Sequence, residues 1–507
     1  MAQVFHNPAE ESFTLANVSA KEGADFLRVC IITPSFPSEP IDGMFLTMSL
    51  EIAEGLKNAG HEVMVVTLSM DKEGDGRVRD LPVYRVLINE NCNFGWGGIL
   101  RLGLIGYWAS QSLELYTRAR ERVAAFNPDI IETHDYFGLG FPWVVEGSYP
   151  VAMRCIGSLP VVMANGSLGD ISAMELNIAR ALELATVTGA DALMSLCYDL
   201  PARISQQSGL ELDRFKIIRT PLTMCCEPSK KSDHSGAVGK FPQLFSWGRV
   251  DPQKGFDLIV EAMPAIKKRF PSAYLRIAGN QNYCKEYSQK IQTRVDELHL
   301  SESVSFEGEL PRAEIQRIAV ESDICIFVSR YETACYACLE AMSYGACVIA
   351  SAAGGLGEYV QDRKTGLLID VDDRAALEAS VIELSDDARL REKLAEAGRQ
   401  SIKEMCSPAR AIAETVAVYE EAIVSFQTGL NARERARKTV PNIMQFLQIA
   451  ALDKSHGEAI TKLAGENYAK GFRDGRNYEQ INFTAQSALQ KPSVLRRIAR
   501  KVKRLIQ

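Results

Sequence analysis

Short, uninterrupted runs of apolar residues alternate along the chain with stretches in which apolar positions recur every three to four residues. The first run, LRVCIIT at 27–33, is followed by a loop, a periodic stretch at about 46–59 and a second apolar run, EVMVVT, at 62–67. Continuous apolar runs are typical of strands buried on both faces, and the periodic stretches are typical of helices. The pattern predicts an α/β protein with a doubly wound parallel sheet.

The same alternation continues and then starts again after a polar segment. The segment MCCEPSKKSDHSGAVGK, at 224–240, is broken by Pro and Gly and predicts a linker between two domains. A helix is predicted at 256–270, before Pro271. Further strands are predicted at 82–87, 129–133, 192–196 and 216–219 in the first half, and at 244–246, 274–278, 304–306, 324–328, 347–350 and 366–369 in the second. Two such domains leave a cleft between them, where ligands usually bind.

One apolar stretch, FGWGGILRLGLIGYW at 94–108, carries a single charge, Arg101. It is too short to span a bilayer. A core helix is one interpretation, and a helix that faces lipid or an acceptor is the other, which Trp96 and Trp108 at its two ends favour.

Composition narrows the class of protein without naming a function. The chain has 507 residues, 46% hydrophobic and 24% charged, as in ordinary soluble proteins of two or three domains. Residues 1–26 are polar, show neither the basic nor the apolar region of a signal peptide, and predict a disordered leader. We therefore expect a cytoplasmic protein with reduced thiols. Cys335 and Cys338 lack a second pair at zinc spacing and are expected to pack as small apolar residues.

Two glutamates eight residues apart, Glu332 and Glu340, mark the first candidate site. They lie in ETACYACLEAMSYGACVIASAAGGLG, where a helix is predicted at 334–344, ending at Gly345. Glu332 would lie in the loop before this helix and Glu340 almost two turns inside it. Carboxylates in these places can bind hydroxyl groups of a ligand whose anionic part rests on the helix N-terminus. A loop cap and a surface glutamate are the alternative.

A candidate phosphate site follows the first strand of the second half. The chain has neither a GxGxxG after a strand nor a GxxxxGK[ST], which weighs against a dehydrogenase and a P-loop NTPase. Arg249 and Lys254 are flanked by glycines just before a helix, and can neutralise a diphosphate as a fork and a point charge. Gly354 and Gly355 would let a second backbone segment approach the same anion. No Asp-x-Asp suggests a metal site, so no metal is expected; a solvated loop is the alternative.

Two further candidates lie in the first half. The predicted strand at 129–133 brings His134 and Asp135 to its carboxyl end, where doubly wound sheets keep their ligands. A structural role for His134 and a functional one both stay open. Gly43 lies in a loop that either passes close to a ligand or simply turns.

In this order, the motifs resemble the retaining glycosyltransferases of family 4, which have the GT-B fold. The resemblance covers about residues 28–419. It is carried by RVCIITPSFPSEPIDGMF, GHEVMVVT, FSWGRVDPQKGFDLIVEA, LRIAG, VSFEGELPRAEIQRIAVESDICIFVS, the Glu-x7-Glu stretch and SYGACVIASAAGGLGEYVQDRKTGLL. It implies two Rossmann-like doubly wound parallel-sheet domains that face a cleft: an acceptor domain at 27–223, the linker at 224–240, a donor-binding domain at 241–407, a crossover helix at 408–427 and a helical basic tail at 428–507.

The resemblance also implies an activity and a set of site residues. The activity is transfer of a sugar from a nucleotide-diphosphate donor to a glycan or lipid-linked acceptor, with retention and without a cofactor or metal. Arg249 and Lys254 would bind the diphosphate, Glu340 the ribose hydroxyls, and Glu332 the transferred sugar. The other implied residues are Gly354, Gly355 and Glu358 in the loop beside the phosphates, Leu310 beside the base, His134 reaching the donor sugar, and Gly43 in the acceptor loop.

Three departures from the family pattern concern the donor sugar and the acceptor. Ala334-Cys335 stand where the family has Phe-Gly, Asp42-Gly43 where it has Gly-Gly, and Thr220-Pro221-Leu222-Thr223 where it has Asn-Gly-Val-Asp. A non-catalytic GT-B scaffold that binds a nucleotide or glycan, and a GT-B sugar-nucleotide epimerase, are the alternative functions.

The C-terminal tail differs in charge from the rest of the chain. The net charge is −7, yet residues 430–507 hold 16 Lys/Arg against 6 Asp/Glu. Within 491–507 there are seven basic residues and no acidic one, with apolar residues at helical spacing. A basic amphipathic helix of this kind predicts peripheral binding to an anionic membrane surface, on the inner face of the membrane; docking on the acidic body is the alternative. Nucleic acid is not expected, because these 17 residues contain no aromatic side chain for base stacking.

Overall fold

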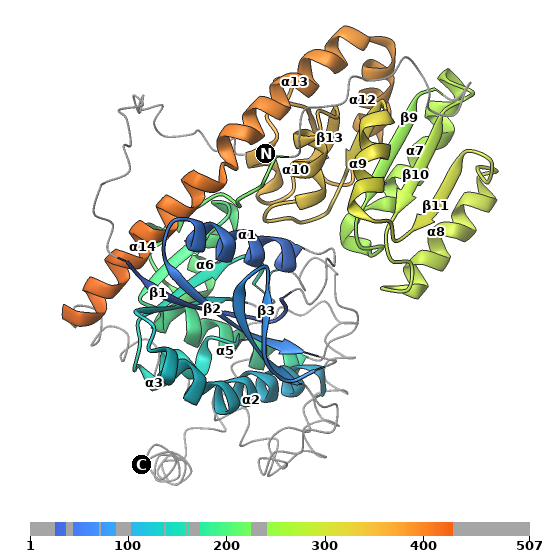
Figure 1. Cartoon of the computed structure of the whole chain (residues 1–507). Helices are drawn as coiled ribbons and strands as arrows, with labels where there is room; N and C mark the ends of the chain where they lie inside the picture. The colour runs from blue at the N-terminus through green and yellow to red at the C-terminus, as the bar shows by residue number, and fades with distance from the viewer. Residues whose placement is uncertain are drawn as a thin grey trace.

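Two parallel sheets, each covered by helices, form the body of the protein in the computed structural model (Figure 1). The structure describes residues 26–36, 44–69, 72–87, 103–135, 138–158, 161, 173–224 and 241–428. Gly43, most of the predicted leader and linker, residues 94–102 and the basic tail from 429 onward lie outside the described residues.

The first sheet has eight strands in the order β3-β4-β2-β1-β5-β6-β7-β8. β3 and β4 pair antiparallel and all other neighbours pair parallel. The strands are β1 Arg28–Thr33, β2 Glu62–Ser69, β3 Gly74–Val78, β4 Leu81–Leu87, β5 Ile130–His134, β6 Val151–Cys155, β7 Ala192–Ser195 and β8 Phe215–Ile217. The predicted strands of the first half are therefore present, and two more, β3 and β6, were not predicted.

Helices pack on both faces of this sheet. They are α1 Met44–Asn58, α2 Gly103–Phe126, α3 Phe141–Glu146, α5 Ala173–Gly189 and α6 Asp199–Ser208. Leu115, Ala119 and Val123 of α2 are buried in a core cluster with β5 and α3. The apolar stretch at 94–108 thus runs into helix α2, and the part of α2 that follows the stretch packs on the core of its own domain. None of the helices in the described residues is long and apolar enough to cross a membrane.

The second sheet has six parallel strands in the order β11-β10-β9-β12-β13-β14. Its strands are β9 Gln243–Trp247, β10 Tyr274–Ala278, β11 Val304–Gly308, β12 Ile324–Phe327, β13 Val348–Ser351 and β14 Leu367–Ile369. Its helices are α7 Phe256–Arg269, α8 Lys285–Glu297, α9 Arg312–Glu321, α10 Tyr336–Ser343, α11 Leu356–Tyr359, α12 Arg374–Asp386 and α13 Ala388–Met405. The two parallel-sheet domains confirm the predicted fold class.

The long helix α14, Pro408–Thr428, leaves the second domain and packs on the first (Figure 1). It contacts α1 closely: a Cβ atom on Gly55 would lie 2.5 Å from Cγ1 of Ile412. Its side chains also reach β5 and β6, where Thr415 and Tyr419 bond to a buried ion pair.

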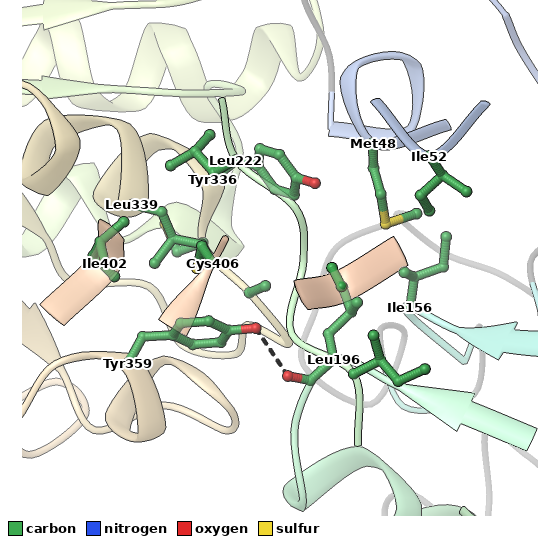
Figure 2. Close-up of a cluster of buried hydrophobic side chains, with 14 of the residues drawn as sticks. Met48, Ile52, Ile156, Leu196, Leu222, Tyr336, Leu339, Tyr359, Ile402 and Cys406 are labelled. Atoms are coloured by element: carbon green, nitrogen blue, oxygen red, sulfur yellow. Dashed lines mark hydrogen bonds between the residues drawn. The ribbon is translucent and has the colours of Figure 1, made fainter. Parts of the chain in front are cut away.

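One apolar core joins the two domains. Figure 2 shows side chains of the first domain facing side chains of the second across the interface. The labelled residues are Met48, Ile52, Ile156, Leu196 and Leu222 of the first domain, and Tyr336, Leu339, Tyr359, Ile402 and Cys406 of the segment from the second domain onward; Leu222 lies beside Tyr336 and Leu339. Burial of this apolar surface favours the arrangement in which the two domains are packed against each other.

Candidate active site

The loop after β9 brings the predicted cations to the carboxyl end of the second sheet. Asp251 folds this loop, because its side chain accepts a hydrogen bond from the backbone N–H of Lys254. Gly255 then adopts a φ of +70°, and a Cβ atom there would lie 2.3 Å from the carbonyl oxygen of Val328. Only glycine fits this turn, which places Lys254 beside the segment that follows β12.

Lys254 and Glu332 form the centre of the site. Nζ of Lys254 donates to Oε1 of Glu332 at 2.5 Å, and the Ser329 hydroxyl donates to the same oxygen at 2.9 Å. The two charged side chains are 17% and 8% exposed. Burial disfavours the charge on Lys254, but the Glu332 carboxylate outweighs it and raises the pKa of Lys254. The ammonium of Lys254 therefore stays protonated at neutral pH.

Arg249 lies at the mouth of the same loop. Its Nε donates to Oδ2 of Asp251 at 3.0 Å and its Nη2 to Oε1 of Gln253 at 3.1 Å. The guanidinium carbon lies 5.1 Å from the centroid of the Tyr283 ring. These contacts orient the guanidinium. Because the side chain is 41% exposed, an anion can still reach it.

Glu340 projects from α10 toward the N-terminus of α9. Helix α10 begins at Tyr336, two residues later than predicted, so Glu340 lies about one turn inside it and not almost two. Its carboxylate pairs with Arg312 Nη2 at 3.1 Å. Leu310 precedes Arg312 by two residues and packs against the core at its partly buried position. Arg312 is not among the predicted site residues, because nothing in the local sequence pattern links it to a carboxylate 28 residues away.

The glycine pair lies against the Glu332 segment. Gly355 donates its backbone N–H to the carbonyl oxygen of Glu332 at 2.7 Å. A Cβ atom on Gly354 would lie 2.5 Å from that carbonyl oxygen, and one on Gly355 would lie 2.2 Å from the carbonyl oxygen of Thr333. Both glycines are thus required by close backbone approach. The cationic, acidic and glycine-rich segments meet in one place.

Glu358, at the end of the glycine loop, contacts the first domain. Its carboxylate accepts the backbone N–H groups of Tyr198 and Asp199 and pairs with Arg219 Nη1 at 2.8 Å. All three donors belong to the first domain. Its place beside the phosphates of a donor stays a prediction.

His134 ends β5 and is fully buried. Burial lowers the pKa of its imidazole to about 4, with Glu132 opposing and Arg154 adding to the shift. The imidazole is therefore neutral at pH 7. Sequence placed this residue correctly at a strand end, but its role in reaching a sugar stays a prediction.

One of the three departures from the family pattern, Ala334-Cys335, lies inside the core. Ala334 and Cys335 are 0% and 3% exposed, and Cys338 is fully buried beside them. Burial raises the pKa of the Cys335 thiol to about 12, so it stays protonated. Both cysteines pack as small apolar residues, as predicted. Among the described residues, no group of three or more His, Cys, Asp or Glu side chains could hold a metal ion.

A doubly wound domain on each side of a shared interface, with charged loops at the strand ends of one of them, defines the GT-B architecture. The structure of sucrose-phosphate synthase from Thermosynechococcus elongatus has this fold: it superposes with a TM-score of 0.64 and 17% identity, over 79% of this chain and 100% of that one. The likeness identifies the fold class.

Family models match each domain separately. Residues 47–220 match the model described as "Glycosyl transferase 4-like domain", and residues 229–401 match "Glycosyl transferases group 1". Both domains of this chain are thus similar to domains of glycosyltransferases.

Two curated relatives are similar over part of their length. Glycogen synthase of Mycobacterium tuberculosis is 24% identical over 282 residues, which is 55% of this chain and 65% of that protein. A GDP-mannose-dependent monoacylated alpha-(1-6)-phosphatidylinositol monomannoside mannosyltransferase of Corynebacterium glutamicum is 30% identical over 206 residues, 39% of this chain and 50% of that protein. This chain thus spans less than two thirds of the length of either relative.

Proposed function

We propose that this protein transfers a sugar from a nucleotide-diphosphate donor to a glycan or lipid-linked acceptor, with retention at the anomeric carbon and without a metal ion. The contact between Lys254 and Glu332, 2.5 Å long, carries the proposal. It joins the loop that holds Arg249 to the segment that Gly355 contacts through its backbone. One end of this arrangement suits a diphosphate and the other suits sugar hydroxyls.

The cationic end would act on the leaving group. As the bond to the anomeric carbon breaks, negative charge grows on the diphosphate, and Arg249 and Lys254 would stabilise that charge more in the transition state than in the ground state. Each cation already has a carboxylate partner, Asp251 or Glu332. A bound diphosphate would therefore share cations that are held in place before it arrives, which lowers the cost of ordering them.

The acidic end would hold the sugars of the donor. Glu332 would meet the transferred sugar and Glu340 the ribose hydroxyls, since ionised carboxylates accept hydrogen bonds from hydroxyl groups. Arg312 holds the Glu340 carboxylate at 3.1 Å and would fix its direction. Leu310 lies two residues before Arg312, in the segment proposed to flank the base.

Retention is proposed to follow from attack on the face that the diphosphate leaves. One oxygen of Glu332 is already bonded to Lys254 and Ser329, which weakens it as a covalent nucleophile. The acceptor hydroxyl would form the new bond to the anomeric carbon while the bond to the diphosphate oxygen breaks, and its proton would pass to that oxygen. His134, neutral at pH 7, would contribute no charge. Trapping of a glycosyl-enzyme intermediate would refute this route.

The relatives support the classes of donor and acceptor. The Corynebacterium protein is named for dependence on GDP-mannose and for a phosphatidylinositol mannoside, and the Mycobacterium protein is named for glycogen synthesis. We propose that this chain also acts on a lipid-linked acceptor. We further propose that it is cytoplasmic and that residues 491–507 bind the membrane surface. Flotation of the full chain with vesicles that contain anionic lipid, compared with neutral vesicles, tests the tail.

Two measurements test the function as a whole. Thermal shift with UDP, GDP and ADP at equal concentration identifies the base, because the stabilisation of the native state rises with the logarithm of one plus the ligand concentration over its dissociation constant. Release of the matching nucleoside diphosphate from a panel of nucleotide sugars, with glycan and glycolipid acceptors, then tests transfer. A scaffold would bind a nucleotide without releasing product, and an epimerase would convert its nucleotide sugar without an acceptor.

A further inference from the structure

The carboxylate of Glu358 bonds the second domain to the first. It accepts the backbone N–H of Tyr198 at 2.8 Å and that of Asp199 at 3.1 Å, and it pairs with Arg219 Nη1 at 2.8 Å. The side chains of Glu358 and Arg219 are 21% and 19% exposed. Hydrogen bonds to a charged group in such a partly buried place are stronger than those between neutral groups.

Glu358 supplies what the N-terminus of α6 lacks. Tyr198 stands at the N-cap position and makes no side-chain capping bond. The first N–H groups of a helix have no partner inside the helix, and the helix dipole favours a negative charge beside them. Asp199, in the same first turn, pairs with Arg203 at 2.7 Å. The cap therefore comes from the other domain, from a residue about 160 positions away in sequence.

The same contact fixes the glycine loop of the candidate site. Glu358 follows Gly355 by three residues, within the short helix α11. A Cβ atom on Gly355 would lie 2.5 Å from Cβ of Cys197, just before Tyr198, so the loop is enclosed between Cys197 and the Glu332 segment.

The neighbouring residue extends this attachment. Tyr359 donates its hydroxyl hydrogen to the carbonyl oxygen of Leu196 at 2.8 Å (Figure 2). Arg219 donates to the same carbonyl oxygen at 2.8 Å. A shift of the glycine loop against residues 196–199 would break the Tyr359 bond to Leu196 together with the Glu358 bonds to Tyr198 and Asp199.

We infer that Glu358 is a positioning residue for sugar transfer: it holds Gly354, Gly355 and Glu332 in register with the first domain, and it does not bind the donor. The kinetic part of this inference rests on the proposed function. The structural part rests on the contacts of Glu358 alone, so the two can be tested separately.

The structural test uses amide hydrogen exchange of the ligand-free full chain. Tyr198 and Asp199 donate their backbone N–H groups to Glu358, so Glu358→Ala should raise their exchange rates about tenfold or more. Glu358→Gln keeps an acceptor oxygen and should restore part of the protection. Glu383→Gln is the matched control, since Glu383 pairs with Arg363 on the exposed surface of the same domain. Unchanged exchange at both amides in Glu358→Ala would overturn the inference.

The kinetic test separates positioning from donor binding. Glu358→Gln should lower kcat about tenfold and leave the dissociation constant of the nucleoside diphosphate within about twofold. Arg219→Gln should act in the same way, and the double variant should be no worse than the more affected single variant. Nucleotide binding weakened tenfold or more by Glu358→Gln would make it a donor contact and overturn the inference. If the unaltered chain binds no nucleotide, the proposed function fails, while amide exchange still decides the role of Glu358.

Discussion

Two ion pairs, one in each domain, show how the same chemistry can serve architecture or binding. Arg154 of β6 binds Glu132 of β5 through two bonds, Nε to Oε1 at 2.8 Å and Nη2 to Oε2 at 3.0 Å, with both side chains at most 1% exposed. Nη2 of Arg154 also reaches Thr415, and the Tyr419 hydroxyl bonds Glu132. This pair lies in strands and attaches α14 to the first sheet.

The pair of the second domain, Lys254 with Glu332, is less fully enclosed. Lys254 and Glu332 lie in loops, share one ion-pair contact and keep some exposure. Glycines at 255, 354 and 355 let the backbones of these loops approach each other. A fully buried pair joined by two bonds is out of reach of a ligand, whereas a partly exposed ammonium with three N–H groups and one short contact can bind one.

Removal of the Lys254 charge should have the largest effect, and on activity. Lys254→Met should lower kcat/KM about a thousandfold, or about 4 kcal/mol of transition-state stabilisation. The free energy of unfolding should fall by only about 1 kcal/mol, because Ser329 still bonds Glu332. Nucleoside diphosphate release and urea unfolding measure the two effects.

Lys268→Met is the control, since it removes an exposed lysine from α7. It should leave both quantities unchanged. An activity of Lys254→Met within tenfold of the unaltered chain would contradict the distinction between the two ion pairs.

Removal of the Arg154 charge should instead act on stability. Arg154→Met leaves the Glu132 carboxylate buried without its cation and should lower the free energy of unfolding by about 3 kcal/mol. A double variant, Arg154→Met with Glu132→Leu, should recover most of that loss, since apolar groups of similar size can replace a buried pair. Urea unfolding measures both. A loss below about 1 kcal/mol in the single variant would show that this pair does not hold the domain together.

The same contrast explains which strands could be predicted. The sequence predicts each of the six strands of the second domain, including β10, YLRIA, whose Arg276 is only partly buried and pairs with Glu307. Strand β6, VAMRC, was missed because Arg154 interrupts its apolar run, and β3, GDGRV, has almost no apolar residue. Arg154 is tolerated in a buried strand only because Glu132 lies opposite it. That partner is 22 residues away, beyond the reach of a local pattern.

The site divides in a similar way. Arg249, Lys254 and the glycine pair could be predicted as a candidate phosphate site because each set lies within a short segment of the sequence. The pairing of Glu340 with Arg312, and of Glu358 with the N-terminus of α6, depends on contacts 28 and about 160 residues apart in sequence. Such contacts are set by the packing of whole helices and domains, so periodicity and spacing carry no sign of them.

Glu51 extends the comparison, because it is a partly buried carboxylate without a bidentate partner. For Glu132, burial raises the pKa, but Arg154 outweighs it and the pKa is lowered. For Glu51 of α1, burial raises the pKa to about 7, although Thr223 donates its backbone N–H at 3.2 Å. Arg312 lowers this pKa and Glu340 raises it, so their effects oppose each other. Pairing, more than burial, therefore decides the charge of a buried carboxylate.

The smallest effect that we predict follows from this raised pKa. A group whose pKa is higher in the folded state stabilises that state most below its unfolded value of 4.5, and the contribution is lost as the pH rises toward 7. Glu51→Gln removes the ionisable group and with it this loss of stability. At pH 4.5 the variant should unfold at about the same urea concentration as the unaltered chain. At pH 8 its free energy of unfolding should be higher by about 2 kcal/mol. Glu54→Gln, on the same helix with the exposed partner Arg79, should show no such pH dependence. An equal effect of Glu51→Gln at both pH values would mean that the shape of the side chain, and not its charge, sets its contribution to the free energy of unfolding. That result would contradict the conclusion that pairing decides the charge of such a carboxylate.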